Sequence, residues 1–333
     1  MKKIFKIGKV NFTKKKTILI AEAGVNHNGK LILAKKLALN AKNSQDGVVI
    51  KGQEIIELVD TGKAPLSQID EVYDASDSVV LPGLINTHHH FYQTLTRAYP
   101  EALNKELFPW LKSLYKVWAH IQPEMLSVST ELALSELLLS GCTTASDHHY
   151  LFPSQLENAI DIQVEQAQKL GMRVVLTRGS MSLGEKDGGL PPQSVVQTKE
   201  QILSDSERLI KSYHNADKGA MTQIALAPCS PFSVTTELMQ ETAELAKQYD
   251  VRLHTHLAET IDEENFCLKK FGLRTVDYLE SVGWLSGRTW LAHGIHFNPE
   301  EIQKLGKSGV GICHCPSSNM MLASGICRSL ELE

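Results

Sequence analysis

From Leu81 onward, short apolar stretches alternate with longer segments in which apolar residues recur at helical spacing. This alternation is typical of repeated β-α units around a parallel sheet. We predict strands near Leu84–His88, Cys142–Asp147, Arg173–Thr177, Gln223–Ala227, Arg252–His256, Thr289–His293 and Val310–His314. Helices are predicted between them, over residues 123–141, 154–171, 199–215, 235–250 and 298–309.

These strands define the expected fold class. No Gly-rich dinucleotide fingerprint follows any of them, which favours a (β/α)8 TIM barrel over an open doubly wound sheet. The eighth β-α unit is not visible in the sequence. We therefore expect an α/β protein whose residues 81–333 form a truncated TIM barrel that lacks its last strand.

The first 80 residues follow other patterns. In residues 1–45, the apolar run "TILIAEA", a polar turn and a helix from about Leu31 to Lys42 make one β-α unit. Residues 46–80 alternate apolar runs with Gly turns, which predicts short antiparallel strands of an incomplete small β-sandwich domain. The predicted organisation is therefore three segments, at 1–45, 46–80 and 81–333.

Unusual polar residues gather where the predicted barrel strands end, which is where barrel enzymes place their catalytic groups. His88 and His90 are two residues apart, so both side chains can face one ion while His89 points elsewhere. An isolated pair of this kind more often packs inside the fold. A third histidine, His256, ends another strand, and three imidazoles that leave one position open suit a catalytic zinc ion.

Further polar residues accompany these three histidines. Glu259 follows His256 where the chain leaves its strand, and a carboxylate there can carry a proton from an attacking water to a leaving group. His293 ends the next strand, and we predict a functional role for it. His254 lies one layer deeper, so we interpret it as a core histidine or as a support for a ligand. His148 and His149 follow the second strand.

Composition and charge indicate which partners and which cellular location to expect. The chain has 333 residues, 22% of them charged, and a formal net charge of −4, so bulk electrostatics do not favour nucleic-acid binding. No apolar stretch is long enough to cross a bilayer, and no secretory signal is recognisable, which predicts a cytoplasmic protein without a membrane partner. Its six cysteines are expected to be reduced thiols. The run "CHC" at 313–315 could be a metal pair, but an apolar strand is the favoured context.

Four motifs together resemble the amidohydrolase superfamily, in its branch of aromatic-base deaminases and triazine hydrolases. They are "LPGLINTHHHFYQTLTR", "HTHLAET", "LAHGIHF" and "CPSSNMMLASGI", in that order. Within the branch, "GCTTASDHHYLFP" and "RGSMSLGEKDGGLPPQSVVQ" resemble the 8-oxoguanine deaminases. The resemblance implies zinc-dependent hydrolytic deamination of a small aromatic base, with 8-oxoguanine converted to urate and ammonia. Guanine deamination and triazine hydrolysis are the alternatives within the branch.

The same resemblance implies one zinc ion per chain, held by His88, His90 and His256 together with an aspartate at the end of strand eight. It gives Glu259 the role of proton shuttle and His293 that of orienting water or substrate. The sequence has no aspartate after Asp277 and ends at "CRSLELE". We therefore keep a catalytically inactive fragment as the alternative from another class.

Two candidates could bind a purine-like ring, Gln93 on the loop after the first strand and Arg178 just past the third, although both could be ordinary loop residues. Trp110 and Trp118 could cover the ring, but aromatic residues on an amphipathic helix more often belong to the core. The sequence leaves a homo-oligomer possible.

Residues 1–45 resemble the opening β-α unit of the N-acylneuraminate (sialic acid) synthases. A single β-α unit cannot form the active site of such a synthase, so we do not expect synthase activity. A chimeric, truncated gene product is the simplest explanation, and a genuine fusion is the alternative. A third hypothesis places "TILIAEA" in the position of the missing eighth barrel strand, beside the first.

Overall fold

A computed structural model describes residues 5–7, 10–12, 18–20, 47–51, 54–59, 70–73 and 80–333. The chain divides into two compact units. The first comprises residues 1–86, 136–144 and 217–219, and the second comprises 87–135, 145–216 and 220–333. The predicted division into 1–45, 46–80 and 81–333 stays a prediction, and the predicted helix near residues 31–42 lies outside the described residues.

Short paired strands characterise the first unit. Strand β1 (Phe5–Ile7) pairs antiparallel with β2 (Val10–Phe12), and β4 (Gly47–Lys51) pairs antiparallel with β5 (Glu54–Val59), as the Gly-punctuated pattern predicts for residues 46–80. Strand β3 (Ile18–Ile20) pairs in parallel with β6 (Val80–Pro82) in a two-stranded sheet of its own. Strand β3 thus pairs with the residues just before β7 and is not part of the seven-stranded sheet among the described residues, so its placement in the eighth barrel position stays a prediction.

A seven-stranded sheet carries the predicted barrel, in the order β13-β12-β11-β10-β9-β8-β7. Every register between β9 and β13 is parallel. The strands are β7 (Leu84–Asn86), β8 (Cys142–His149), β9 (Arg173–Ser180), β10 (Thr222–Pro228), β11 (Leu253–Leu257), β12 (Thr289–His293) and β13 (Gly311–Cys313). All seven predicted strands are confirmed, with ends that move by up to three residues, and sequential order across the sheet is what repeated right-handed β-α units produce.

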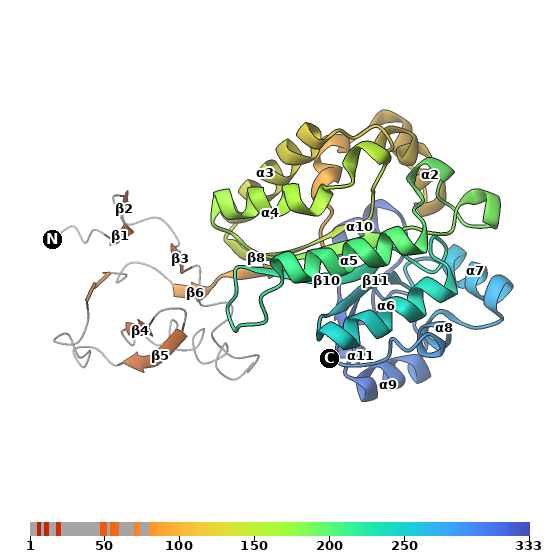
Figure 1. The fold of residues 1–333 in the computed structure, drawn as a ribbon. Helices are drawn as coiled ribbons and strands as arrows, with labels where there is room; N and C mark the ends of the chain where they lie inside the picture. Colours follow the sequence, from red (N-terminus) through yellow and green to blue (C-terminus); the bar gives the residue numbers. More distant parts are fainter. Residues whose placement is uncertain are drawn as a thin grey trace. The chain divides into compact units, whose positions relative to one another are not determined.

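The helices follow the strands in the expected alternation. Helices α4, α5 and α6 lie in succession along the sheet in Figure 1, with α4 packed on β9 and both α5 and α6 packed on β10. The helices are α2 (Leu107–Trp118), α3 (Pro123–Leu139), α4 (Ala159–Leu170), α5 (Lys199–Tyr213), α6 (Thr236–Tyr249), α7 (Ile261–Phe271), α8 (Thr275–Ser281), α9 (Pro299–Ser308), α10 (Pro316–Met321) and α11 (Ser329–Leu332).

Local chemistry explains where these helices begin and end. Capping boxes at Thr198 and Asn298 satisfy the first free amides of α5 and α9. Gly171 and Gly309 end α4 and α9 with φ of 67° and 70°, a conformation that glycine adopts without a steric penalty. Because these signals are local, the sequence predicts the helix limits closely.

Burial explains why the strands read as continuous apolar runs. Nearly every residue of β9, β10 and β11 is buried, as expected for a parallel sheet covered on both faces. Trp118 is fully buried against Tyr92 and Trp110, which confirms a core role for that aromatic residue. Several polar residues are also buried toward the carboxyl ends of strands in this sheet, among them His149, His256 and His293.

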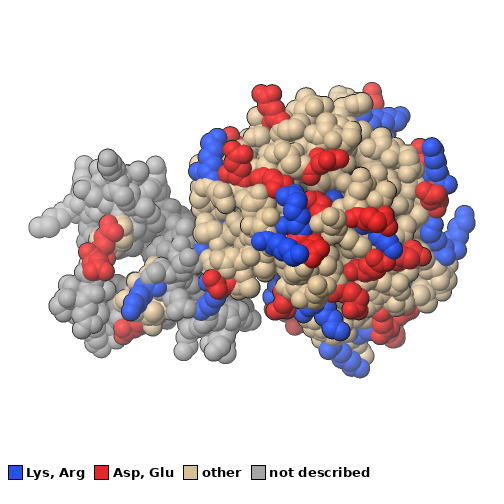
Figure 2. Space-filling model, in the orientation of Figure 1, with Lys and Arg blue, Asp and Glu red and all other residues tan. Residues whose placement is uncertain are grey.

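The surface is mixed in charge. On the face that Figure 2 shows, Lys and Arg side chains are interspersed with Asp and Glu. Among the described residues, several charged side chains form ion pairs, such as Arg208 with Asp161 at 2.8 Å. The described residues on this face therefore present no continuous basic patch, and among all described residues none of the helices is long and apolar enough to cross a membrane.

Candidate active site

The first two candidate ligands lie on the segment that follows β7. His88 and His90 come two and four residues after Asn86, the last residue of β7. The observed strand is therefore shorter than the predicted one, but both histidines still follow its carboxyl end. Asp147 fixes this segment, because one carboxylate oxygen accepts the Phe91 amide at 2.6 Å and the other accepts the Gln163 amide at 2.6 Å. Burial raises the pKa of Asp147 to about 7.

The fold brings the three predicted ligands together. One ring nitrogen each of His88, His90 and His256 lies within 4.8 Å of the other two. The first two residues come from the segment after β7 and His256 from β11. By contrast, His89 belongs to none of the ligand clusters among the described residues, as the alternation predicts.

Hydrogen bonds to backbone carbonyls fix the tautomers of two of these rings. His90 Nδ1 lies 2.7 Å from the carbonyl oxygen of His148, and His256 Nδ1 lies 2.6 Å from that of Cys229. A carbonyl only accepts, so each Nδ1 carries the hydrogen and each Nε2 presents a lone pair.

The third ring follows the same logic through a relay. His254 Nδ1 donates to the Trp290 carbonyl at 2.8 Å, which leaves His254 Nε2 as an acceptor. His88 Nδ1 lies 2.8 Å from that nitrogen and donates to it, so the ring hydrogen of His88 is on Nδ1 and its Nε2 presents a lone pair, as in the other two rings. His254 thus supports the candidate ligand His88, which is one of the two roles that the sequence suggested for it.

This donor set fits a divalent cation. His90 Nε2 and His256 Nε2 face each other at 3.2 Å, and neither carries a hydrogen to donate. A shared cation or an extra proton would remove the repulsion between these two lone pairs. Burial disfavours the extra proton, because it would place a positive charge away from water. Burial is the main reason why the pKa of His256 falls to about 4 and that of His90 falls well below 6.5. Neutral imidazole is the form that binds a metal.

Beside the three nitrogens lies a carboxylate and imidazole pair. Glu259 Oε2 is 3.4 Å from His293 Nε2, and both side chains are buried. Burial, with the neighbouring charge of Glu263 second, raises the pKa of Glu259 to about 8. Glu263 holds the backbone in turn, because it accepts the amides of Ala258 at 3.1 Å and Glu259 at 2.9 Å. Glu259 can therefore hold or release a proton near neutral pH.

The backbone is strained at the carboxyl ends of β11 and β12, the two strands that position Glu259 and His293. Ala258 and His293 directly follow or end strands β11 and β12, with φ of 52° and 77°. A non-glycine residue in this region costs about 1–3 kcal/mol and persists only where surrounding contacts enforce it. One such contact is Asn319 of α10, whose amide nitrogen lies 3.0 Å from His293 Nδ1.

The two predicted substrate residues differ in their surroundings. Gln93 is half-buried on a short 3-10 helix (Phe91–Thr96), and its amide lies 3.4 Å from the Tyr92 hydroxyl. Arg178 is fully buried, and its three guanidinium nitrogens contact Asp205, Gln197 and the Gly179 carbonyl. Its cation also lies 3.8 Å from the Phe152 ring centre. A substrate contact by Arg178 stays a prediction, and it would require one of these bonds to be exchanged.

Three residues near the site received no role from the sequence. Asn319 and Cys315 come from "CPSSNMMLASGI", and Cys315 also belongs to the run "CHC", for which an apolar strand was the favoured interpretation. Cys315 offers a sulfur within 4.8 Å of ligand atoms on His88 and His293. His148, noted only as a residue near a strand end, stacks on His256 with ring centres 4.5 Å apart.

The chain is similar to known proteins over most of its length. The sequence profile of the amidohydrolase family matches residues 79–332. The 8-oxoguanine deaminase of Pseudomonas aeruginosa is 66% identical over 294 residues, which cover 88% of this chain and 66% of that protein. Isoxanthopterin deaminase from an unknown prokaryotic organism is 34% identical over 79% of this chain and 55% of that protein.

Solved structures agree. The atrazine chlorohydrolase of Arthrobacter aurescens TC1, complexed with zinc, superposes with a TM-score of 0.73 and 32% identity. The match covers 77% of this chain and 59% of that one. This chain thus spans about 55 to 66% of the length of the two curated relatives. The profile match extends over most of the chain and includes every residue of the site, so the chain belongs to the amidohydrolase family.

Proposed function

We propose that this chain carries the zinc site of a hydrolytic deaminase that acts on an aromatic base, with 8-oxoguanine as substrate and urate and ammonia as products. The observation that carries the proposal is the convergence of three neutral imidazole nitrogens beside a buried carboxylate whose pKa lies near neutrality. The 66% identity to an 8-oxoguanine deaminase supports this choice of substrate.

His88, His90 and His256 would hold the zinc ion through their Nε2 atoms. When bound, zinc supplies Lewis-acid chemistry that makes water a stronger acid at neutral pH. The hydrogen bonds to the carbonyls of His148 and Cys229 keep two of these ligands in the tautomer that coordination needs.

Glu259 would move the protons. Its carboxylate takes a proton from the attacking water and passes it to the exocyclic nitrogen of the ring, which departs as ammonia. A pKa near 8 lets one group act as both acceptor and donor around neutral pH. Because Glu263 anchors the Glu259 amide, the carboxylate stays beside the reacting atoms.

His293 would orient the reactants. Asn319 donates to Nδ1 of this ring, which places the ring hydrogen on Nε2, toward Glu259. From there His293 can donate to the carboxylate or to an oxygen of water or substrate. Gln93 is the candidate that would recognise the polar edge of the base.

The test is ammonia release by the purified protein with added zinc. Parallel assays with 8-oxoguanine, guanine and a hydroxylated s-triazine separate the three substrate classes of the branch. Turnover that is fastest with 8-oxoguanine supports the proposal, whereas preference for guanine or the triazine replaces the substrate and leaves the metal chemistry in place. His120, which is exposed and outside the site, provides the matched control through His120→Ala.

Zinc stoichiometry separates an enzyme from an inactive fragment. We expect one zinc ion per chain in the described site, measured by atomic absorption after dialysis. A chain that retains no zinc and releases no ammonia from any of the three substrates would contradict the proposal.

A further inference from the structure

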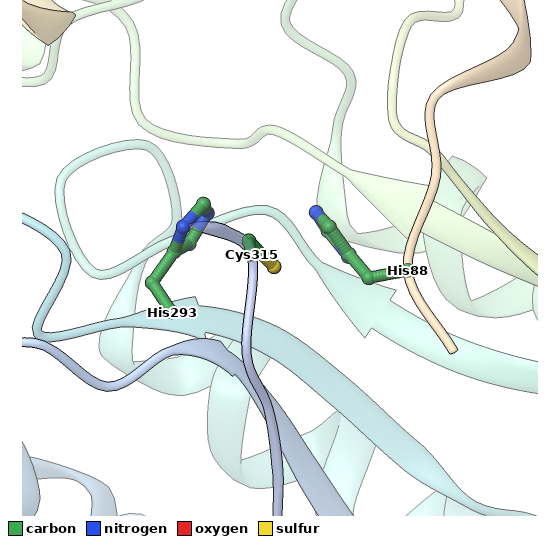
Figure 3. Close-up of side chains that lie close together, drawn as sticks. All are labelled: His88, His293 and Cys315. Atoms are coloured by element: carbon green, nitrogen blue, oxygen red, sulfur yellow. The ribbon is translucent and has the colours of Figure 1, made fainter. Parts of the chain in front are cut away.

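A second set of donor atoms overlaps the zinc site. Ligand atoms of His88, His293 and Cys315 lie within 4.8 Å of one another. Figure 3 shows the Cys315 side chain between the two imidazole rings, with each of the three residues on a separate segment of the chain. Both sets contain His88. The second set has a nitrogen of His293 and the sulfur of Cys315 in place of the nitrogens of His90 and His256.

The fold holds Cys315 in this position. The residue immediately precedes α10, and the Asn319 amide donates to the Cys315 carbonyl at 3.0 Å. The Asn319 side chain reaches His293 at 3.0 Å, so α10 ties the sulfur and the imidazole to each other. The neighbouring thiol of Cys313 accepts the Thr87 hydroxyl at 2.9 Å and the Cys315 thiol at 3.9 Å, and it belongs to none of the described clusters.

We propose that His88, His293 and Cys315 form a binding site for a soft, thiophilic divalent cation, which excludes zinc from the three-histidine site. The two sites compete because both use His88 as a ligand, and its Nδ1 is engaged with His254 at 2.8 Å. Thiolate ligands select soft ions, whereas the three-imidazole set suits zinc. On binding, the Cys315 thiol loses its proton to solvent as the sulfur–metal bond forms, and no electrons are transferred. The ring hydrogen of His293 moves from Nε2 to Nδ1, and the Asn319 amide turns so that its oxygen accepts it, which makes Nε2 the nitrogen that binds the cation.

A cation in this second set also affects the proton-carrying pair beside it. A cation held by His293 removes that ring from Glu259, which lies 3.4 Å away. A soft cation in this set would therefore inhibit hydrolysis even when the protein remains folded. Inhibition would require Cys315 and would be relieved by a competing thiol compound.

The experiment uses Cd²⁺ as the probe with metal-freed, full-length protein and without substrate, so that its result is independent of the proposed deaminase activity. One equivalent of Cd²⁺ should produce a sulfur-to-cadmium charge-transfer band in the ultraviolet. Cys315→Ser should lose the band, and Cys313→Ser, the matched control two residues away, should retain it. His256→Ala should also retain it, because that histidine belongs only to the zinc set.

Folding of each variant is checked by circular dichroism. A second measurement uses the unaltered chain: Cd²⁺ should protect Cys315 from alkylation, as mapped by mass spectrometry, while Cys313 stays reactive. Retention of the band by folded Cys315→Ser, or alkylation of Cys315 at the same rate with and without Cd²⁺, would overturn the proposal.

Discussion

The two halves of the site are held in different ways. On the ligand side, the Nδ1 atoms of His88, His90 and His256 lie 2.6–2.8 Å from acceptors within the protein. On the proton side, His293 and Glu259 are separated by 3.4 Å, and His293 takes a left-handed backbone conformation. Short bonds to carbonyls fix a coordination geometry, whereas a looser contact between two titratable groups lets a proton move.

This difference suggests that the two halves can be altered separately. Changes on the ligand side should act on metal affinity, and changes on the proton side should act on the rate with the metal retained. If a change on the proton side lowered metal affinity, the two halves would instead form one cooperative network.

The largest effect is expected from His256→Ala. The change removes one of three nitrogen ligands, so the loss of zinc affinity should exceed the roughly 10–100-fold that follows when only an outer partner is removed. Competition with a zinc-binding dye measures the affinity, and His120→Ala should leave it unchanged. Wild-type zinc affinity in a folded His256→Ala variant would remove this histidine from the ligand set.

Next in size is Glu259→Gln, which keeps the shape of the side chain and removes its capacity to carry a proton. Turnover should fall by about 10²–10⁴, because that is the typical contribution of a positioned proton carrier. Zinc content should stay at the wild-type value. A similar loss of zinc in this variant would contradict the separation of the two halves.

A smaller effect is expected when the support of His88 is removed. In His254→Phe, the ring can still stack on Trp290, whose ring centre lies 4.2 Å away, but His88 Nδ1 loses its acceptor. Zinc affinity should fall by roughly 10–100-fold. Asn319→Ala is the matched change on the proton side, and it should lower turnover while leaving zinc affinity within about threefold.

The smallest effect concerns the stability of the metal-free protein as pH changes. Burial lowers the pKa of the site histidines, to about 4 for His256 and about 3 for His254, so the unfolded chain binds more protons than the folded one below pH 6.5. Stability should therefore fall as pH decreases from 6.5. Burial raises the pKa of Glu259 to about 8 and those of Glu263 and Asp147 to about 7. The folded chain then holds more protons than the unfolded one, and stability should also fall as pH rises toward 8.

Between pH 4.5 and 6.5 both groups titrate, and the histidines prevail because they outnumber the acids. Burial lowers the pKa of eight histidines among the described residues, namely His88, His90, His148, His149, His214, His254, His256 and His293. The melting temperature of chelator-treated protein, measured by calorimetry, should peak near pH 6.5. A melting temperature that rises steadily from pH 6.5 to 8 would show that the buried acids do not control this limb.

The sequence by itself determined the β-α alternation, because helical and strand periodicity and the caps at Thr198 and Asn298 are local signals. It also determined which face of the chain His88 and His90 share, since residues two apart in an extended segment point the same way. The position of β3 was a different matter. Its strand character was local, but its partner β6 lies about 60 residues later, and pairing over that distance leaves no trace in the pattern.

Only the tertiary structure decided how the site works. The tautomers of His90 and His256 depend on carbonyls of His148 and Cys229, which are 58 and 27 residues away and are brought close by the sheet. The approach of Cys315 to His88 likewise depends on strands at opposite ends of the sheet order. A local pattern specifies which groups a residue offers, but hydrogen-bond acceptors and burial come from distant segments, and those set protonation and ligand geometry.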